Sequence, residues 1–196
     1  MASLSSQSLS HVEYPSLSAS SGVSVASWSS HSRMSELLQS CRVRRAGPGD
    51  AETLSSLAFR SKASWGYDIE FMKRCRDELT YSEEDIDAPR FLFHVCELDH
   101  ELVGFYALEI LSEIEAELED LFVKPDLIRK GIGKLLVDHV RSEAELLGIH
   151  TITIQSDPNA DAFFKSIGAR FSGYRESSSI PGRLLPVFKL EINKGK

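Results

Sequence analysis

The chain has 196 residues, of which 42% are hydrophobic, and these numbers fit one packed domain with additional segments. A formal net charge of −7 excludes a protein that binds nucleic acid over its whole surface, and no apolar run approaches the ~18 residues of a membrane span, so we expect neither partner. Three cysteines, a small and odd number, indicate a reducing compartment rather than a disulfide framework.

The first 40 residues are dense in serine and show no amphipathic period, which predicts a domain boundary near residue 41. Such a segment buries too little apolar surface to offset its ordering entropy, so the sequence predicts a disordered extension over 1–40. A Ser-rich segment poor in acids is also typical of a transit peptide, which would direct the protein to an organelle such as the plastid rather than leave it cytoplasmic. Met34 offers a third interpretation, a start site downstream.

From residue 41 to residue 194 the pattern is that of one globular domain. In chain order it predicts a strand at 41–46, helices at 51–62 and 69–79, a polar loop at 81–90, strands at 91–98, 101–111 and 115–123, a helix at 131–147, a strand at 150–155, a short helix at 157–168, and final strands at 170–176 and 184–192. Asp50 and Asp68 are the predicted N-caps of the first two helices. This order predicts an α/β fold in which a mixed sheet carries helices on both faces.

Two glycines, Gly131 and Gly133, open the helix at 131–147, where a glycine costs about 1 kcal/mol relative to alanine. The stretch matches neither the dinucleotide fingerprint GxGxxG nor the P-loop GxxxxGK[ST]. The first N–H groups of a helix lack internal partners, and bare glycine backbone lets a phosphate approach them. Arg129, Lys130 and Lys134 add positive charge. The sequence therefore predicts a phosphate site, with glycines that only permit close packing as the alternative.

The strand before this helix breaks its period of two. Leu118 and Leu121 are three residues apart, which indicates a β-bulge at Glu119–Asp120. A bulge splays a strand from its neighbour and frees backbone groups for a ligand. A splayed strand that leads into an anion-binding helix start suits an elongated ligand with a pyrophosphate at one end and an amide-rich arm at the other.

Two stretches, "LEDLFVKPDLIRKGIGKLL" and "DPNADAFFKSIGA", resemble the GNAT superfamily of acetyl-CoA-dependent N-acetyltransferases, and the order of elements extends the resemblance over about 41–192. The family pattern is a (Q/R)xxGx(G/A) turn after a bulged strand, then an asparagine-led helix. The resemblance implies the GNAT fold, a mixed and mostly antiparallel sheet of six to seven strands with one splayed, bulged strand. It also implies acetyl-CoA as co-substrate and no metal.

The resemblance also implies roles for individual residues. The pantetheine arm would meet the backbone of Leu121, Phe122 and Val123 and the side chain of Asn159, and the pyrophosphate would meet Arg129, Lys130, Gly131, Ile132, Gly133 and Lys134. Two positions depart from the family pattern. Ile128 stands where a Gln or Arg is expected, and Phe164 stands where a tyrosine often protonates the departing thiolate. Tyr174 or water would then supply that proton.

Acetyl transfer also needs a base that deprotonates the amine and a donor that polarises the carbonyl, for which the backbone N–H near Val123 is the candidate. In the histone-acetylating branch of the family the base corresponds to Glu117, so Glu117 is the first candidate. Glu119 and Asp120 are the alternatives, and a merely solvated acidic strand face is the remaining interpretation. The acid-rich strand favours a cationic or amine acceptor.

Acceptor contacts are predicted at Trp65 and Tyr67, as an aromatic wall or lid, and at Arg183, which could pair with a carboxylate. Hydrophobic packing and a surface turn are the simpler interpretations of these residues. No zinc-ligand spacing appears, and His94 with Cys96 on one strand face is too few ligands for a metal site. The sequence thus predicts an N-acetyltransferase for a small-molecule amine. A protein or peptide acetyltransferase, or a non-catalytic acyl-CoA sensor, is the alternative, and a homodimer is left open.

Overall fold

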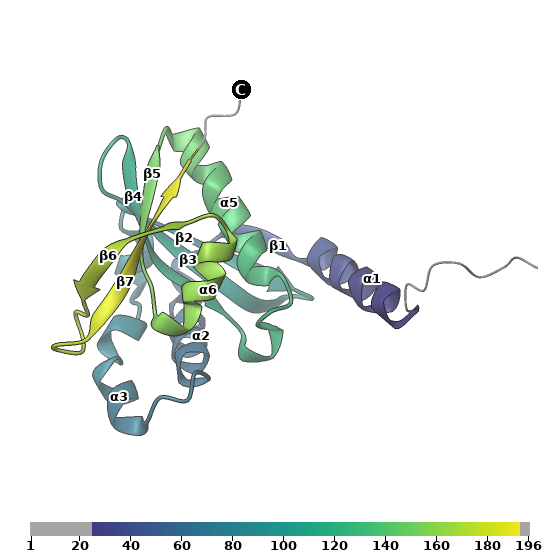
Figure 1. Cartoon of the computed structure of the whole chain (residues 1–196), viewed down its shortest axis with the longest axis horizontal. Helices are drawn as coiled ribbons and strands as arrows, with labels where there is room; N and C mark the ends of the chain where they lie inside the picture. The colour runs from purple at the N-terminus through teal and green to yellow at the C-terminus, as the bar shows by residue number, and fades with distance from the viewer. Residues whose placement is uncertain (1–24, 193–196) are drawn as a thin grey trace, which may run out of the picture.

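One seven-stranded sheet organises the protein, whose computed structural model describes residues 25–192 (Figure 1). The strand order is β1-β2-β3-β4-β5-β7-β6, and only β4 and β5 pair in parallel. The strands are β1 (Arg42–Arg45), β2 (Phe91–Leu98), β3 (Glu101–Ile110), β4 (Glu115–Val123), β5 (Thr151–Gln155), β6 (Arg170–Glu176) and β7 (Leu184–Glu191). The predicted α/β fold with a mixed, mostly antiparallel sheet is confirmed.

Helices pack on both faces of this sheet. They are α1 (Val25–Ser40), α2 (Ala51–Ala63), α3 (Ile69–Arg74), α4 (Glu83–Asp87), α5 (Ile132–Leu147) and α6 (Asp161–Ser166). The apolar stripe of α5 and the buried Phe164 of α6 join one core cluster, and α2, α3 and α4 contribute to a second cluster on the other face. Strand residues alternate between the two, as Phe93 and Val95 face α2 while Cys96 faces α5. Within 25–192 no helix is long and apolar enough to cross a membrane.

The N-terminal segment differs from the sequence-based expectation. Residues 25–40 form α1, which extends away from the body of the domain, and Leu37 and Leu38 near its C-terminal end pack against the α5 side of the core (Figure 1). The predictions for residues 1–24 lie outside the described residues.

Two local predictions need correction. Asp50 does not cap α2, because its carboxylate accepts from Gly47 N at 2.9 Å and from Arg44 Nη1 at 2.8 Å within the preceding turn. The stretch at 81–90 is not only loop, since it contains α4, which is capped by Ser82. Asp68 does cap α3, where it accepts from Phe71 N at 2.8 Å.

Candidate active site

A V-shaped opening between two parallel strands forms the floor of the site. β4 pairs with β5 only from Glu115–Thr151 to Glu117–Thr153, so beyond that point β5 offers no partner to the rest of β4. On the other side the β3–β4 register shifts at Ala107/Leu108, which leaves Glu119 as the extra residue and confirms the predicted bulge. A cleft of about 1280 Å³ occupies the opening, and residues from β4, α2 and the starts of α5 and α6 line it.

One end of the cleft has the form of an anion site. Gly131 is the N-cap of α5 with φ = 90°, and Arg129 also takes a left-handed conformation with φ = 63°. Left-handed residues that are close in sequence can turn several backbone N–H groups toward the same anion. At the start of a helix the helix dipole adds positive potential there. Of the residues predicted to bind coenzyme, the cleft is lined by Leu121, Phe122, Val123, Arg129, Gly131, Gly133, Lys134 and Asn159. Lys130 lies outside its lining, and the side chain of Ile132 is buried in the core.

The two glycines also have packing reasons. A Cβ at Gly131 would lie 3.0 Å from Leu38 Cδ1, and one at Gly133 would lie 3.3 Å from the ring of Phe163. Close packing, which the sequence presents as the alternative to phosphate access, therefore applies at this turn, and phosphate access stays a prediction. Ile128, the residue that departs from the family pattern, lines the cleft beside Arg129.

Three acidic residues of β4 have different environments. Glu117 is 7% exposed, and its carboxylate accepts from Arg175 Nη1 of β6 at 2.5 Å. This ion pair links β4 to β6 across the sheet. Burial, reinforced by the charges of Glu117 and Asp120, raises the pKa of Glu119 to about 7. Burial also raises the pKa of Asp120 to about 7, against the opposing influence of Tyr81 and Lys62. Glu119 and Asp120 therefore titrate near neutral pH.

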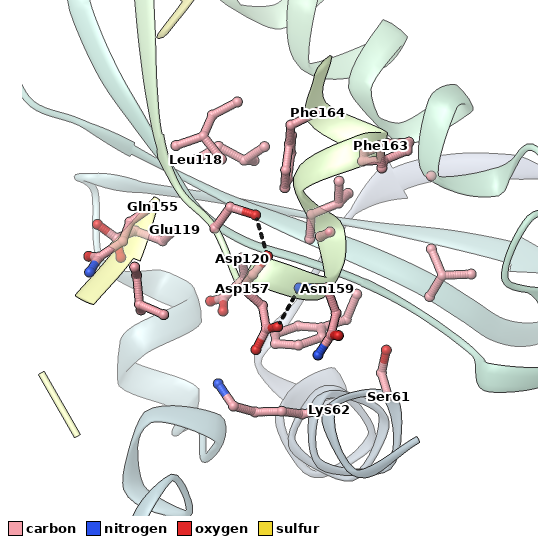
Figure 2. Close-up of a pocket in the computed structure, with 18 of the residues that line it drawn as sticks. Ser61, Lys62, Leu118, Glu119, Asp120, Gln155, Asp157, Asn159, Phe163 and Phe164 are labelled. Carbon is pink, nitrogen blue, oxygen red and sulfur yellow. Dashed lines mark hydrogen bonds between the residues drawn. The ribbon is translucent and has the colours of Figure 1, made fainter. Parts of the chain in front are cut away.

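Asp120 lines the cleft together with Lys62. Figure 2 shows Glu119 and Asp120 on β4, with Lys62 of α2 reaching into the same pocket. Lys62 Nζ forms an ion pair with Glu78 at 2.8 Å, so its charge is partly neutralised and Asp120 keeps a high pKa. Together with Glu117 and Glu119, these groups make the acceptor half of the cleft rich in carboxyl groups.

The raised pKa of Asp120 predicts a pH-dependent stability change. The native state binds a proton at Asp120 more tightly than the unfolded chain, so this residue lowers stability as pH rises from about 4 through about 7. Asp120→Asn should therefore be more stable than the wild type at pH 8, on the order of 2 kcal/mol or several degrees in Tm, with no gain at pH 4. Thermal unfolding at both pH values measures this. An Asp120→Asn variant that is less stable at pH 8 would contradict the raised pKa.

A hydrogen-bonded group, here called the Tyr67 cluster, lies beside the cleft: Asp157, Asn159 and Arg183 line it, whereas Tyr67, a predicted acceptor contact, does not. It comprises Tyr67, Asp157, Asn159 and Arg183. The Tyr67 hydroxyl lies 2.8 Å and 2.9 Å from the two carboxylate oxygens of Asp157 and accepts from Arg183 Nη2 at 2.7 Å. Tyr67 follows α2, which packs on β4, whereas Asp157 follows β5. The cluster therefore joins the loop between α2 and α3 to the segment after β5 and to the turn between β6 and β7, and sequence analysis did not detect it.

Two residues predicted to contact the acceptor, Trp65 and Arg183, both line the cleft but differ in their contacts with the protein. Trp65 lines the cleft and is 41% exposed. Arg183 also lines the cleft, but its Nη2 already donates to Asp157 at 3.2 Å, and its guanidinium stacks over Phe71 at 4.8 Å. The sequence predicts that Arg183 pairs with a carboxylate of the acceptor. In the structure Arg183 pairs with the carboxylate of Asp157 instead. Phe164 is 6% exposed and packs on Phe188.

Tyr174, the predicted substitute for a tyrosine acid, lies away from the cleft. Its ring packs edge-on against Phe171 with centroids 5.1 Å apart, and it is 66% exposed on β6. Among the cleft-lining residues of the described chain there is no tyrosine. The prediction that Tyr174 protonates the thiolate is therefore not supported by its position.

A histidine cluster packs β2 and β3 against α5. Ligand atoms of His94, His139 and Glu143 lie within 4.8 Å of one another, and the Tyr106 hydroxyl is 2.9 Å from His139 Nδ1. Zinc with ligands at about 2.0–2.1 Å holds them roughly 3.4 Å apart, so this spacing is loose for a metal site. Burial, together with the nearby His139, lowers the pKa of His94 to about 4, so this histidine remains neutral in the core.

Comparisons with known proteins agree with this geometry. Residues 65–178 match the family model described as an acetyltransferase (GNAT) domain. An uncharacterized N-acetyltransferase of Methanocaldococcus jannaschii is 27% identical over 163 residues, which cover 79% of this chain and 69% of that protein. A [ribosomal protein bS18]-alanine N-acetyltransferase of Salmonella typhimurium is 30% identical over 73 residues, which cover 36% of this chain and 49% of that protein.

Solved structures share the fold. The PaiA N-acetyltransferase of Thermoplasma acidophilum, determined in complex with coenzyme A, superposes with a TM-score of 0.65 at 23% identity, covering 78% of this chain and 99% of that one.

Proposed function

Because the chain belongs to the GNAT family of N-acetyltransferases, which use acetyl-CoA, we propose that it transfers the acetyl group directly to the amine of a small cationic molecule. One observation carries the proposal. The acceptor half of the cleft is rich in carboxyl groups, two of them with a pKa near 7, and the Tyr67 cluster lies beside it.

The residues of the cleft fit the coenzyme. The left-handed backbone at Arg129 and Gly131 presents N–H groups and positive charge for a pyrophosphate, and β4 after Glu117 has no strand partner on the β5 side. An amide-rich arm can hydrogen-bond to that edge as a further strand would. Acetyl-CoA supplies the acetyl group as a thioester. The protein's residues supply its position and the proton transfers.

Asp120 acts as the general base. A base works best when its pKa is close to the working pH, and Asp120 combines a pKa of about 7 with a position at the bulge, inside the cleft. It takes the proton of the acceptor's ammonium group, so that the amine nitrogen can bond to the acetyl carbon as the carbon–sulfur bond breaks. Glu117, the first candidate from the sequence, is instead paired with Arg175 at 2.5 Å, and it adds to the effect of burial in raising the pKa of Glu119.

The leaving thiolate takes its proton from water. Phe164 has no proton to give, and the described residues that line the cleft include no tyrosine or cysteine. A free thiol has a pKa of about 8.5, so the thiolate can depart before it is protonated. Direct transfer, without an acetyl group on an enzyme cysteine, is supported by the positions of Cys41, Cys75 and Cys96, none of which lines the cleft.

A small acceptor is supported by the Tyr67 cluster, because its hydrogen bonds tie the loop between α2 and α3 to Asp157 and Asn159 and oppose the separation that a longer chain would need. The acceptor is cationic because five carboxyl side chains surround the acceptor half, with Lys62 and Arg183 as the cations among the lining residues there. The five are Glu78, Glu117, Glu119, Asp120 and Asp157. Lys62 is paired with Glu78, Arg183 with Asp157 and Arg175 with Glu117, so within the described residues Glu119 and Asp120 are the acids of this group without an ion-pair partner.

A protein N-terminus is the second candidate acceptor. It is supported by the similarity to the Salmonella protein that acetylates the alanine of ribosomal protein bS18. An N-terminal peptide is also an amine, and an acidic cleft would favour a basic one. This candidate requires the loops joined by the Tyr67 cluster to separate.

Release of free thiol from acetyl-CoA with a panel of acceptors tests the proposal. The panel includes monoamines, diamines, free amino acids and short peptides that begin with alanine. We expect turnover with small diamines at a kcat/KM at least tenfold above that with alanine-initiated peptides. Peptides as the best acceptors would favour the second candidate. Coenzyme A that protects the protein from heat while no amine releases thiol would favour the non-catalytic sensor.

A further inference from the structure

The Tyr67 hydroxyl lies within hydrogen-bond distance of four polar atoms but has one proton to donate. It lies 2.8 Å and 2.9 Å from the carboxylate oxygens of Asp157, 2.7 Å from Arg183 Nη2 and 3.1 Å from Asn159 Nδ2. A phenol offers one O–H donor and two acceptor sites. The identity of each donor in the Tyr67 cluster can therefore be worked out from the chemistry of its members.

The single proton of Tyr67 goes to Asp157. An ionised carboxylate can only accept and a guanidinium can only donate, so Arg183 donates to the phenol and Asp157 accepts from it. Burial, with the neighbouring Asp157, raises the pKa of Tyr67 to about 12, so the hydroxyl keeps its proton at neutral pH. Toward Asn159 the phenol oxygen can then only accept.

The amide of Asn159 is thereby oriented. Its Nδ2 must face Tyr67, because an amide oxygen in that place would meet an oxygen with no proton left to give. The backbone N–H of Asn159 also donates to Asp157, at 2.9 Å, which fixes the start of the helical turn (Figure 2). In the described part of the chain no group donates to Asn159 Oδ1, and Asn159 lines the cleft.

We propose that Tyr67 is a positioning residue of the transferase, which orients the Asn159 amide so that Oδ1 accepts a hydrogen bond from an N–H of the bound coenzyme. This inference rests on the proposed function, in which the coenzyme arm lies along β4 and Asn159. Tyr67 belongs to the loop between α2 and α3, on the acceptor side. The acceptor loop and the coenzyme site are therefore joined through one hydroxyl.

The substitution Tyr67→Phe tests this role. It keeps the ring, which stacks on Phe71 with centroids 4.1 Å apart and lies beneath Arg183, and removes only the hydroxyl. We expect the Kd for coenzyme A, measured by calorimetry, to rise by about 3- to 10-fold, the value of one neutral hydrogen bond. The KM for acetyl-CoA should rise by the same factor while kcat changes less than twofold. Tyr174→Phe, on the exposed face of β6, is the matched control and should bind like the wild type.

A double-mutant cycle with Asn159→Ala separates positioning from a general structural effect. If Tyr67 acts through Asn159, Tyr67→Phe should weaken coenzyme binding less than twofold in the Asn159→Ala background. Equal losses in both backgrounds, or a single Tyr67→Phe variant that binds like the wild type, would overturn the inference. A wild-type protein that binds no coenzyme A would instead refute the proposed function, and the inference with it.

Discussion

Replacing Asp120 with asparagine is expected to lower kcat/KM for the amine acceptor by about 10²- to 10⁴-fold, the range for loss of a general base. Asparagine keeps the size of the side chain but cannot take a proton. The base acts only when ionised, so wild-type activity should rise with pH through a pKa of about 7 and be lost below it. In the Asp120→Asn variant this limb of the kcat/KM profile should disappear, which initial rates between pH 5 and pH 9 would measure.

Glu119→Gln is the matched control, since Glu119 is adjacent and also has a pKa raised to about 7. It should lower the rate less than Asp120→Asn and retain the pH-dependent limb. That limb should move to lower pH if the carboxyl groups of Glu119 and Asp120 interact electrostatically. Removing the negative charge of Glu119 would then favour ionisation of Asp120. The reverse pattern, with the limb lost in Glu119→Gln and kept in Asp120→Asn, would assign the base to Glu119.

The sequence could predict the bulge and the helix start at the proposed coenzyme end of the cleft because their signals are local. A step of three between Leu118 and Leu121 marks the bulge, and Gly131 and Gly133 mark the bare helix start, all within 16 consecutive residues. Short-range steric rules decide such features, so the register shift and the left-handed N-cap follow the pattern. The missed helix α4 also had a local signal, since Ser82 and Asp85 have the spacing of a capping box.

The acceptor end depends on contacts between distant segments. Tyr67 meets Asp157 across 90 positions of the chain and Arg183 across 116, and Glu117 meets Arg175 across 58. The residue type at each of these positions does not show which distant residue it contacts. The choice among the three acids of β4 was equally hidden, because it depends on which carboxyl group forms an ion pair, as Glu117 does with Arg175, and on how far the cleft desolvates each of the others. Desolvation and pairing are properties of the assembled cleft.

Gly131→Ala is expected to weaken coenzyme A binding by about 10- to 100-fold, the equivalent of one or two charge-assisted hydrogen bonds. At φ = 90° a Cβ strains the backbone, and it would also lie 3.0 Å from Leu38 Cδ1. Relief of this strain turns the first N–H groups of α5 away from the point where they converge. Calorimetric titration with coenzyme A measures the loss. S-acetylpantetheine, which lacks the pyrophosphate, should keep its KM within about threefold.

Gly148→Ala supplies a control at the other end of the same helix. Gly148 has φ = 77°, and a methyl group added there would meet nothing within 4 Å, so its substitution brings similar backbone strain without touching the cleft. Both variants should lose about 1 kcal/mol of stability, and only Gly131→Ala should lose coenzyme affinity. Equal affinities in the two variants would mean that Gly131 is required only for its packing against Leu38. A loss confined to Gly131→Ala, and to ligands that carry the pyrophosphate, would assign the left-handed turn to phosphate binding.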